Sequence, residues 1–190
     1  VYDTTTYQIK VNHTTGAYWE KESNDTFDTA NAIALEKTYS GSIQKSSDKD
    51  YYKVTLTADG ALRANFAHPS VSGRESNYVW KVSLYKDSDR SNAIYSRSIY
   101  GGDMNTALPQ MGLKAGSYYV CVESATLSDT STYQISTSFT KSSYWEMEPN
   151  DSTTTATEIK NLDKTYSGSI YKLADVDYYK VTLASAGGLG

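Results

Sequence analysis

The stretch DKDYYKVTLTADGALRANFA at 48–67 predicts two β-strands joined by a tight turn. In each half, apolar side chains alternate with polar ones, and this period of two is typical of a strand that buries one face. The Ala-Asp-Gly between the halves is a hairpin turn signal. The stretch therefore indicates an antiparallel hairpin with both strands facing one core. The residues expected to face inward are Tyr52, Val54, Leu56, Leu62, Ala64 and Phe66.

Further short strands are expected on either side, at intervals set by turn residues. They are KTYSGSIQ at 37–44, NYVWKVSLY at 77–85, NAIYSRSIY at 92–100, SYYVCVES at 117–124 and STYQISTSF at 131–139. Trp80 lies on the apolar face of its strand, so we expect it in the core. Residues 28–35 predict a short helix or turn, and residues 101–116 a long irregular connection. Seven or eight short strands with little helix predict an all-β, antiparallel β-sandwich.

Most of this pattern occurs twice in the chain. AYWEKESNDT at 17–26 returns as SYWEMEPNDS at 143–152, TYSGSI at 38–43 returns at 165–170, and DKDYYKVTL at 48–56 returns as DVDYYKVTL at 175–183. DTTTYQI at 3–9 matches DTSTYQI at 129–135 in the same way. The spacing between copies is the length of a domain rather than of a solenoid unit. The sequence therefore predicts tandem repeats.

Three parts are expected from this spacing. Residues 1–16 are the terminal strand of a preceding repeat, residues 17–140 a complete β-sandwich repeat, and residues 141–190 the truncated N-terminal part of a following repeat. A sandwich that lacks its later strands leaves an apolar face and open edges exposed. We therefore expect contact with neighbouring repeats of the same protein, and head-to-tail self-association through the truncated ends.

The composition indicates an extracellular protein. Apolar residues make up 38% of the chain, 18 residues are Tyr, and the net charge is −4. No Lys/Arg cluster or stripe occurs, which argues against nucleic acid as a partner. No apolar run is long enough to span a bilayer. With a single cysteine, the fold depends on its core or on a bound ion rather than on an internal disulfide.

Acidic and amide side chains gather at both copies of the junction. In an extended chain, residues two apart point the same way, so Glu20, Glu22 and Asn24 share one face. Asp48 and Asp50 flank the turn before the DYYKV strand. These groups offer only oxygen, which calcium prefers, whereas zinc favours nitrogen or sulfur and magnesium a tighter octahedron. The candidate metal ligands over both copies are Glu20, Glu22, Asn24, Asp25, Asp48, Asp50, Glu146, Glu148, Asn150, Asp151, Asp175 and Asp177.

A second interpretation of these acids needs no metal. They can be solvated charges of a linker, and Asn24 and Asp25 can cap the turn or helix that follows them. Spacing alone leaves the two interpretations about equally open.

The combined motifs resemble the bacterial pre-peptidase C-terminal domain family, which includes the collagen-binding domains of clostridial collagenases. The resemblance rests on EKESND at 20–25 and EMEPND at 146–151, on the GSI and DYYKVTL strands, and on LKAGSYYVCV at 113–122. It implies a jelly-roll-like sandwich that accompanies a secreted peptidase or surface protein, with calcium held where the linker meets the domain. It also implies that Ser42, or a backbone carbonyl nearby, completes the ligands.

Enzymatic activity is not expected. His13 and His68 have no motif around them, and the sequence contains no GxSxG, HExxH, CxxC or phosphate-binding glycine loop. Cys121 has no histidine close to it in the sequence, so we expect an inert thiol.

Three functions remain open. The first is a non-catalytic, calcium-stabilised accessory or spacer repeat of a secreted or cell-surface bacterial protein. The second is a module, attached to a secreted hydrolase or peptidase, that binds extracellular polysaccharide or a fibrous protein such as collagen. The third is an intramolecular chaperone or targeting appendage of a peptidase. A contiguous exposed row of aromatic side chains would favour the second. The candidates for such a row are Tyr39, Tyr51, Tyr85, Tyr95 and Tyr100.

Overall fold

The computed structural model describes residues 6, 8–11, 16–126 and 129–187, and in this part of the chain every regular element is a strand. The strands are β1 (Asn31–Ala32), β2 (Thr38–Gly41), β3 (Lys49–Leu56), β4 (Gly60–Ala67), β5 (Tyr78–Lys86), β6 (Asp89–Tyr100), β7 (Asn105–Ala107), β8 (Met111–Leu113), β9 (Gly116–Ser124), β10 (Tyr133–Lys141), β11 (Thr157–Ile159) and β12 (Tyr179–Val181). Most of the terminal strand expected within residues 1–16 lies outside the described residues.

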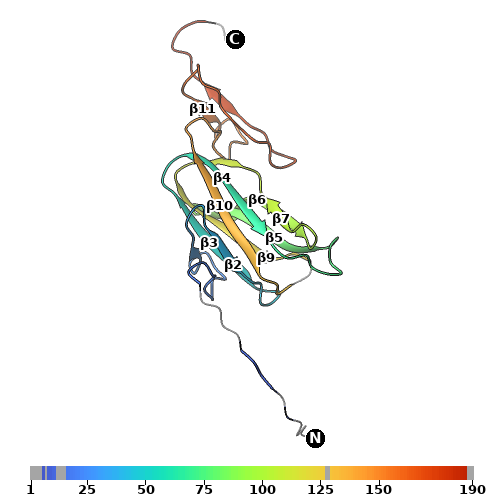
Figure 1. Cartoon of the computed structure of the whole chain (residues 1–190). Helices are drawn as coiled ribbons and strands as arrows, with labels where there is room; N and C mark the ends of the chain where they lie inside the picture. Colours follow the sequence, from blue (N-terminus) through green and yellow to red (C-terminus); the bar gives the residue numbers. More distant parts are fainter. Residues whose placement is uncertain (1–5, 7, 12–15, 127–128, 188–190) are drawn as a thin grey trace.

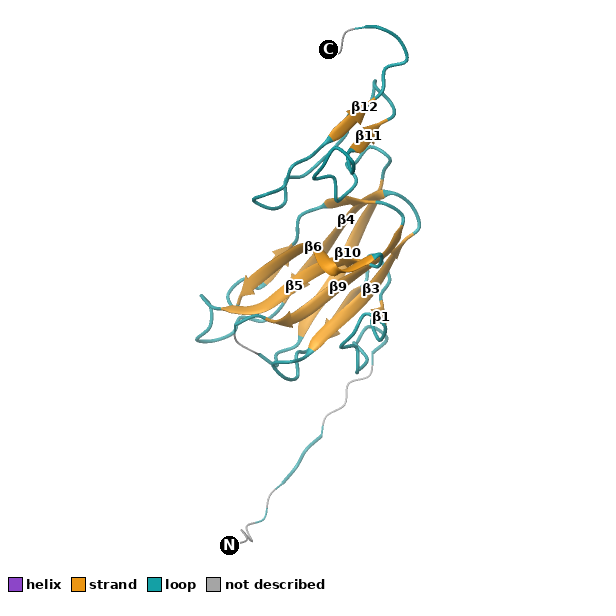
Figure 2. Ribbon diagram, turned by 180° about the vertical axis from the view of Figure 1, so that it is seen from behind, coloured by secondary structure: helices purple, strands orange, loops and turns teal. Residues whose placement is uncertain are grey.

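Two sheets pack face to face and confirm the predicted β-sandwich. One has the strand order β1-β3-β9-β5-β6, and the other β2-β10-β4-β7, with β8 also paired to β4. Apart from the short parallel pair of β1 with β3, the strands of both sheets are antiparallel. Figures 1 and 2 show the sheets as stacked layers, with the chain entering at one end of the sandwich and leaving at the other.

The core lies between the two sheets and contains the inward faces that the alternation predicts. All six residues expected inward from the 48–67 hairpin are at most 2% exposed. Trp80 on β5 is fully buried and packs against Phe66 from the opposite sheet, with ring centroids 5.7 Å apart. The apolar burial that drives folding is therefore concentrated where the period-two pattern placed it.

Of two uncertain connections, one takes an expected alternative and the other differs from expectation. The segment 28–35 forms a turn followed by the two-residue strand β1, and no helix, because Ile33 donates its N–H to the carbonyl of Lys53 on β3. The long connection at 101–116 is not irregular throughout. It contains β7 and β8, which pair with opposite halves of β4.

The C-terminal segment, residues 143–187, repeats the local pairing seen at the start of the sandwich. Asn31 is paired with Tyr52 in the parallel contact of β1 with β3, and Thr157 is paired with Tyr179 in that of β11 with β12. We call residues 17–26 the first junction and residues 143–152 the second junction. They lie at opposite ends of the sandwich (Figure 1). Membership of a longer tandem array remains a prediction.

A small second cluster covers the outer face of the β1-β3-β9-β5-β6 sheet. Tyr51, Tyr119 and Cys121 are buried there, beneath Phe27 from the turn that follows the first junction. Arg90 lies over the rings of Phe27 and Tyr119, at 5.4 Å from each centroid. This face is therefore occupied by the protein's own side chains. In the described part of the chain, no helix is long and apolar enough to cross a membrane.

Candidate metal centre

The first junction runs beside the edge strand β2 and aims its acids at the end of the sandwich. Glu20 donates its N–H to the carbonyl of Ser40 at 2.8 Å, which fixes the direction of its side chain. The Glu20 carboxylate then accepts hydrogen bonds from the Ser42 N–H at 2.6 Å and the Tyr52 hydroxyl at 3.0 Å, and the Tyr133 hydroxyl oxygen lies 3.4 Å from it. The carboxylate is thus held in place by β2, β3 and β10 together.

Two overlapping groups of carboxylates form around Glu20 and Glu22. Ligand oxygens of Glu20, Glu22 and Asp50 lie within 4.8 Å of one another, and so do those of Glu22, Asp25 and Asp48. The spacing of Asp48 and Asp50 places both against the junction, because a β-turn and the first residues of β3 return the chain to it. The structure therefore brings together the five acids that the sequence selected in the first copy.

The Asn24 amide is the centre of this arrangement. Its side chain is fully buried, and its oxygen faces carboxylate oxygens of Glu22 and Asp50. Turning the amide over would instead let its NH₂ group donate to Glu22 at 3.1 Å and to Asp50 at 3.2 Å. Calcium–oxygen distances of 2.3–2.6 Å place neighbouring ligand oxygens roughly 3–3.7 Å apart. The orientation of an amide is assigned from its hydrogen-bond partners, and the turned Asn24 satisfies both carboxylates without a cation.

Electrostatics at the first junction disfavour the ionised acids when no cation is present. Burial raises the pKa of Asp50 to about 9, and the charges of Glu20 and Asp48 add to the rise. Burial likewise raises the pKa values of Glu20, Glu22 and Asp48. Buried carboxylates that repel one another ionise readily only when a positive charge compensates them.

The second junction repeats this geometry at the other end of the sandwich. The Glu146 carboxylate accepts a short hydrogen bond from the Ser169 N–H and one from the Tyr179 hydroxyl at 3.0 Å. Ligand oxygens of Glu146, Glu148 and Asp177 lie within 4.8 Å of one another. Burial raises the pKa of Glu148 to about 7 and that of Asp177 to about 6.

Four oxygens at the second junction are buried and accept no hydrogen bond. They belong to Glu148 (Oε1), Asn150 (Oδ1), Asp175 (Oδ1) and Asp177 (Oδ1). A buried polar atom without a hydrogen bond costs about 1–3 kcal/mol. Of the four, Asp175 Oδ1 also lies 4.0 Å from the Lys172 ammonium, and Glu148 and Asp177 belong to the carboxylate group of this junction. A hard cation is the partner that suits one amide oxygen and three carboxylate oxygens.

Three of the sequence-selected residues also contact other groups of the protein, and their role as ligands stays a prediction. The Ser42 hydroxyl lies 3.5 Å from Glu20 Oε1, to which the Ser42 N–H also donates, so the contacts of this residue orient Glu20. Asp151 forms an ion pair with Lys172 at 3.1 Å, and the Lys172 charge helps lower its pKa. Asp25 accepts the N–H of Lys49 at 3.4 Å on the outer side of its group.

Sequence reasoning missed the residues that support the acids. Tyr52 and Tyr133 share a hydrogen bond of 2.7 Å between their hydroxyls, and Tyr133 also donates a short hydrogen bond to Asp50. A Cβ at Gly41 would collide with Glu20 and with both hydroxyls. The available signal was the recurrence of Gly41 as Gly168 inside the repeated TYSGSI motif.

The histidine and the cysteine that the structure describes lie away from both carboxylate clusters. His68 is buried, stacks on Trp80 with ring centroids 4.1 Å apart, and directs Nδ1 to the carbonyl of Pro69. Cys121 is 1% exposed, and burial raises the pKa of its thiol to about 12. A thiol with so high a pKa is a poor nucleophile at neutral pH. His13 lies outside the described residues.

Fold and site together define a β-sandwich domain with a carboxylate cluster at each end. No family model matches the chain. Among curated proteins, it is 31% identical over 104 residues to the collagenase ColT of Clostridium tetani (strain Massachusetts / E88). That match covers 54% of this chain and 10% of ColT, so the chain spans about a tenth of this relative. The predicted resemblance to clostridial collagenases is confirmed.

Solved structures of low sequence identity share parts of this architecture. The pre-peptidase C-terminal domain of a Bacillus anthracis collagenase is 21% identical, with a TM-score of 0.45, over 57% of this chain and 93% of that one. The PliG inhibitor of g-type lysozyme from Aeromonas hydrophila is 15% identical, with a TM-score of 0.43, over 58% of this chain and 96% of that one.

Proposed function

We propose that this protein is a non-catalytic, calcium-stabilised accessory module of a secreted or cell-surface bacterial protein. Each junction would hold at least one calcium ion and fix the linker to the end of the sandwich. The single observation that carries the proposal is the set of four buried oxygens at the second junction that accept no hydrogen bond. The grouped carboxylates of Glu20, Glu22 and Asp50 support the same role for the first junction.

Calcium is proposed over other cations because of the ligand chemistry. The groups brought together are carboxylate and amide oxygens, without histidine or cysteine, and they come from two segments of chain rather than one rigid loop. Calcium accepts six to eight such oxygens in irregular geometry, whereas magnesium requires a near-ideal octahedron. Calcium sites of extracellular modules typically have dissociation constants of about 0.1–1 mM, and such a site fits an accessory role outside the cell.

The collagenase relative supports an accessory role in a secreted protease. ColT is named as a collagenase, and the chain matches a tenth of it without containing a catalytic motif. We therefore infer that the catalytic domain of the parent protein is separate from this module.

The tyrosine row expected of a ligand-binding module does not form among the candidates. Tyr39 and Tyr51 are buried, and Tyr85 and Tyr95 are half-buried. Tyr100 is the exception, because it stacks on Tyr78 with centroids 4.2 Å apart and both rings are exposed. This pair is the one observation that favours a second function, binding of polysaccharide or a fibrous protein. Loss of retention on either polymer in Tyr100→Ala would support it.

Thermal unfolding of the whole chain tests the calcium proposal. We expect the melting temperature to rise when calcium is added after EDTA treatment, and to rise little with the same concentration of magnesium or zinc. An ion that binds only the folded state, at a hundredfold over its Kd, adds roughly 2.7 kcal/mol, a rise on the order of 5–10 °C. Glu148→Gln should reduce the rise, whereas Asp163→Asn, an exposed acid away from both clusters, should leave it unchanged. An equal response to every cation would refute the proposal.

A further inference from the structure

The second junction is pressed against the sandwich by backbone contacts. The Glu148 N–H donates to the carbonyl of Gly112 on β8 at 2.8 Å, and the Ser169 hydroxyl donates to the carbonyl of Gln110 at 2.7 Å. A Cβ at Gly112 would collide with the carbonyl oxygen of Glu146. The residues that carry the metal-binding side chains therefore also form the contact with β8, and glycine permits their close approach.

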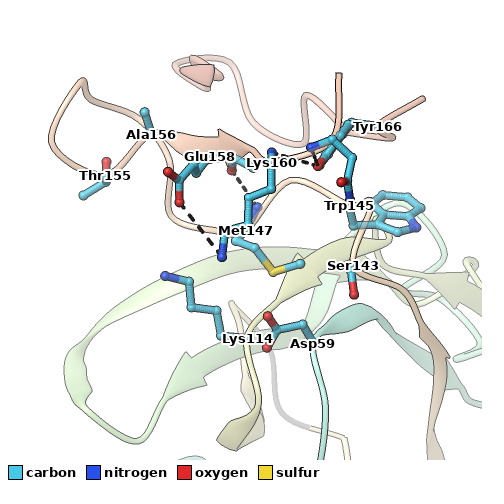
Figure 3. Close-up of a pocket in the computed structure, with 12 residues that line it drawn as sticks. Asp59, Lys114, Ser143, Trp145, Met147, Thr155, Ala156, Glu158, Lys160 and Tyr166 are labelled. Atoms are coloured by element: carbon cyan, nitrogen blue, oxygen red, sulfur yellow. Dashed lines mark hydrogen bonds and ion pairs between the residues drawn. The ribbon is translucent and has the colours of Figure 1, made fainter. Parts of the chain in front are cut away.

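One side of this contact is tight and the other is open. A pocket of about 400 Å³ lies beside it, with Asp59 and Lys114 on the sandwich side and Trp145 and Met147 on the side of the junction (Figure 3). The pocket is open to solvent, so few contacts attach the C-terminal segment on that side. The close contacts on the other side therefore attach this segment to the sandwich.

Tyr171 contacts both the second cluster and the sandwich. Its ring is 7% exposed, belongs to the core cluster of the sandwich and meets the Tyr95 ring edge-on, with centroids 5.8 Å apart. Its hydroxyl donates to Glu148 Oε2 at 3.2 Å, and its N–H donates to Asp175 at 2.7 Å. A single residue thus touches two acids of the second cluster and the core of the preceding sandwich.

The first junction lacks such a residue. The position equivalent to Tyr171 is Gln44, which donates from its side chain to Glu22 at 3.0 Å and is exposed. Glu22 is exposed as well, whereas its counterpart Glu148 is only 3% exposed. The two clusters therefore have the same acids but differ in whether the sandwich covers them.

We propose that Tyr171 couples cation binding at the second junction to docking of the C-terminal segment on β8 and Tyr95. The partner surface is the end of the sandwich around Gln110–Gly112, and the partner is the segment that follows it in the same chain. This inference rests on the proposed function. A cation that orders Glu146 and Glu148 also orders the backbone that contacts β8, so docking and binding must favour each other reciprocally.

Calcium titration of the full chain tests the coupling at each site separately. Asp177→Asn removes a ligand of the second junction, so that calcium binding at the first can be measured alone. Asp50→Asn removes a ligand of the first junction and isolates the second in the same way. In these backgrounds, Tyr171→Gln introduces the residue that the first copy carries, which keeps a donor for Glu148 and removes the packing on Tyr95. We expect about a tenfold weaker Kd at the second junction, within the fivefold to 150-fold range usual for coupled sites, and an unchanged Kd at the first.

Hydrogen exchange of the Glu148 amide measures docking directly, because this N–H donates to Gly112. We expect calcium to slow its exchange in the wild type and in Tyr171→Phe, which keeps the ring, but not in Tyr171→Gln. Gly112→Ala, on the other side of the contact, should accelerate exchange and weaken only the second site.

Each outcome bears on one of the two proposals. If both junctions bind calcium and Tyr171→Gln changes neither Kd, the coupling is wrong and the proposed function stands. The coupling is overturned if Tyr171→Gln weakens calcium binding at both junctions equally. It is also overturned if Tyr171→Phe lowers the calcium affinity of the second junction as much as Tyr171→Gln does, because docking is then not the cause. If neither junction of the wild type binds calcium, the proposed function itself fails and the coupling with it.

Discussion

Asp50 combines full burial, a short hydrogen bond from Tyr133 and close carboxylate neighbours. Because its pKa is raised to about 9 without a cation, the ion-free protein at neutral pH holds it largely protonated. Asn resembles that protonated acid and retains an oxygen that can accept from Tyr133. We therefore predict that Asp50→Asn leaves the melting temperature in EDTA unchanged or higher, while the added stabilisation by calcium falls. A loss of several degrees in EDTA would contradict this.

The raised pKa values also predict how ion-free stability depends on pH. A carboxyl whose pKa is higher in the folded than in the unfolded protein stabilises the fold fully below the unfolded value, near 4, and loses this effect as pH rises through the folded value. With Asp50 at about 9 and Glu148 at about 7, stability in EDTA should fall from pH 5 to pH 8. Carboxylates with lowered pKa values, such as Glu123, titrate below this window.

Calcium should reverse this trend, because it competes with protons for the same oxygens. The increase in melting temperature caused by calcium is predicted to be larger at pH 8 than at pH 5. Melting curves at both pH values, with EDTA and with calcium, provide the measurement. An increase that shrinks as the pH rises would show that other groups bind the ion.

At the residue scale, the sequence indicated which acids cluster, but it did not indicate which side chains hold them in place. Glu20, Glu22 and Asn24 could be placed on one face because an extended chain has a fixed period. The hydrogen bond between the Tyr52 and Tyr133 hydroxyls could not be predicted in this way. It depends on the pairing of β10 with β4 and β2, which places Tyr133 across the core from Tyr52.

Strand β2 positions the first cluster, and Gly41 at its end leaves the space that the Glu20 carboxylate occupies. Gly41→Ala is predicted to destabilise the protein by about 1–3 kcal/mol, the usual cost of overpacking, and to weaken calcium binding at the first junction. Gly187→Ala is the matched control, because no atom lies within 4 Å of the added Cβ. Equal melting temperatures and calcium affinities for the two variants would show that Glu20 does not need this space.

The elements with a strong hydrophobic period could be predicted, and the shortest could not. The β3–β4 hairpin and Trp80 on β5 have the alternating pattern that fixes which face is buried. β7 and β8 contribute three residues each, too few to show a period, and they form because β4 offers free backbone groups along its edge. For segment 28–35 the sequence left helix and turn open, and the turn forms because β1 pairs with β3.

The two ends of the molecule differ in how far their equivalent apolar side chains are buried. Ile43 and Val54 are fully buried in the sandwich, whereas their counterparts Ile170 and Val181 are 66% and 38% exposed. Leu173 is also fully exposed. Tyr133 on β10 donates a hydrogen bond to Asp50, and no hydroxyl of the described residues donates to its counterpart Asp177. The C-terminal segment therefore lacks the contacts that β10 supplies to the sandwich.

A second copy of the chain can supply those contacts. DTTTYQI at 3–9 matches the sequence at 129–135, where β10 begins, so we propose that these residues of one molecule pair with the C-terminal segment of another. Exposed apolar edges favour such strand addition. Sedimentation at increasing concentration should show head-to-tail association, and removal of residues 1–10 should abolish it. A chain that stays monomeric at every concentration would refute this.

The central claim is that the two carboxylate clusters are calcium sites, and anomalous diffraction from crystals grown with calcium tests it most directly. The account predicts a peak at each junction, coordinated by oxygens 2.3–2.6 Å away. At the first junction these would include Glu22, Asn24 and Asp50, and at the second Glu148, Asn150 and Asp177. Peaks absent from both junctions in saturating calcium, with water or a lysine ammonium among these oxygens instead, would contradict it.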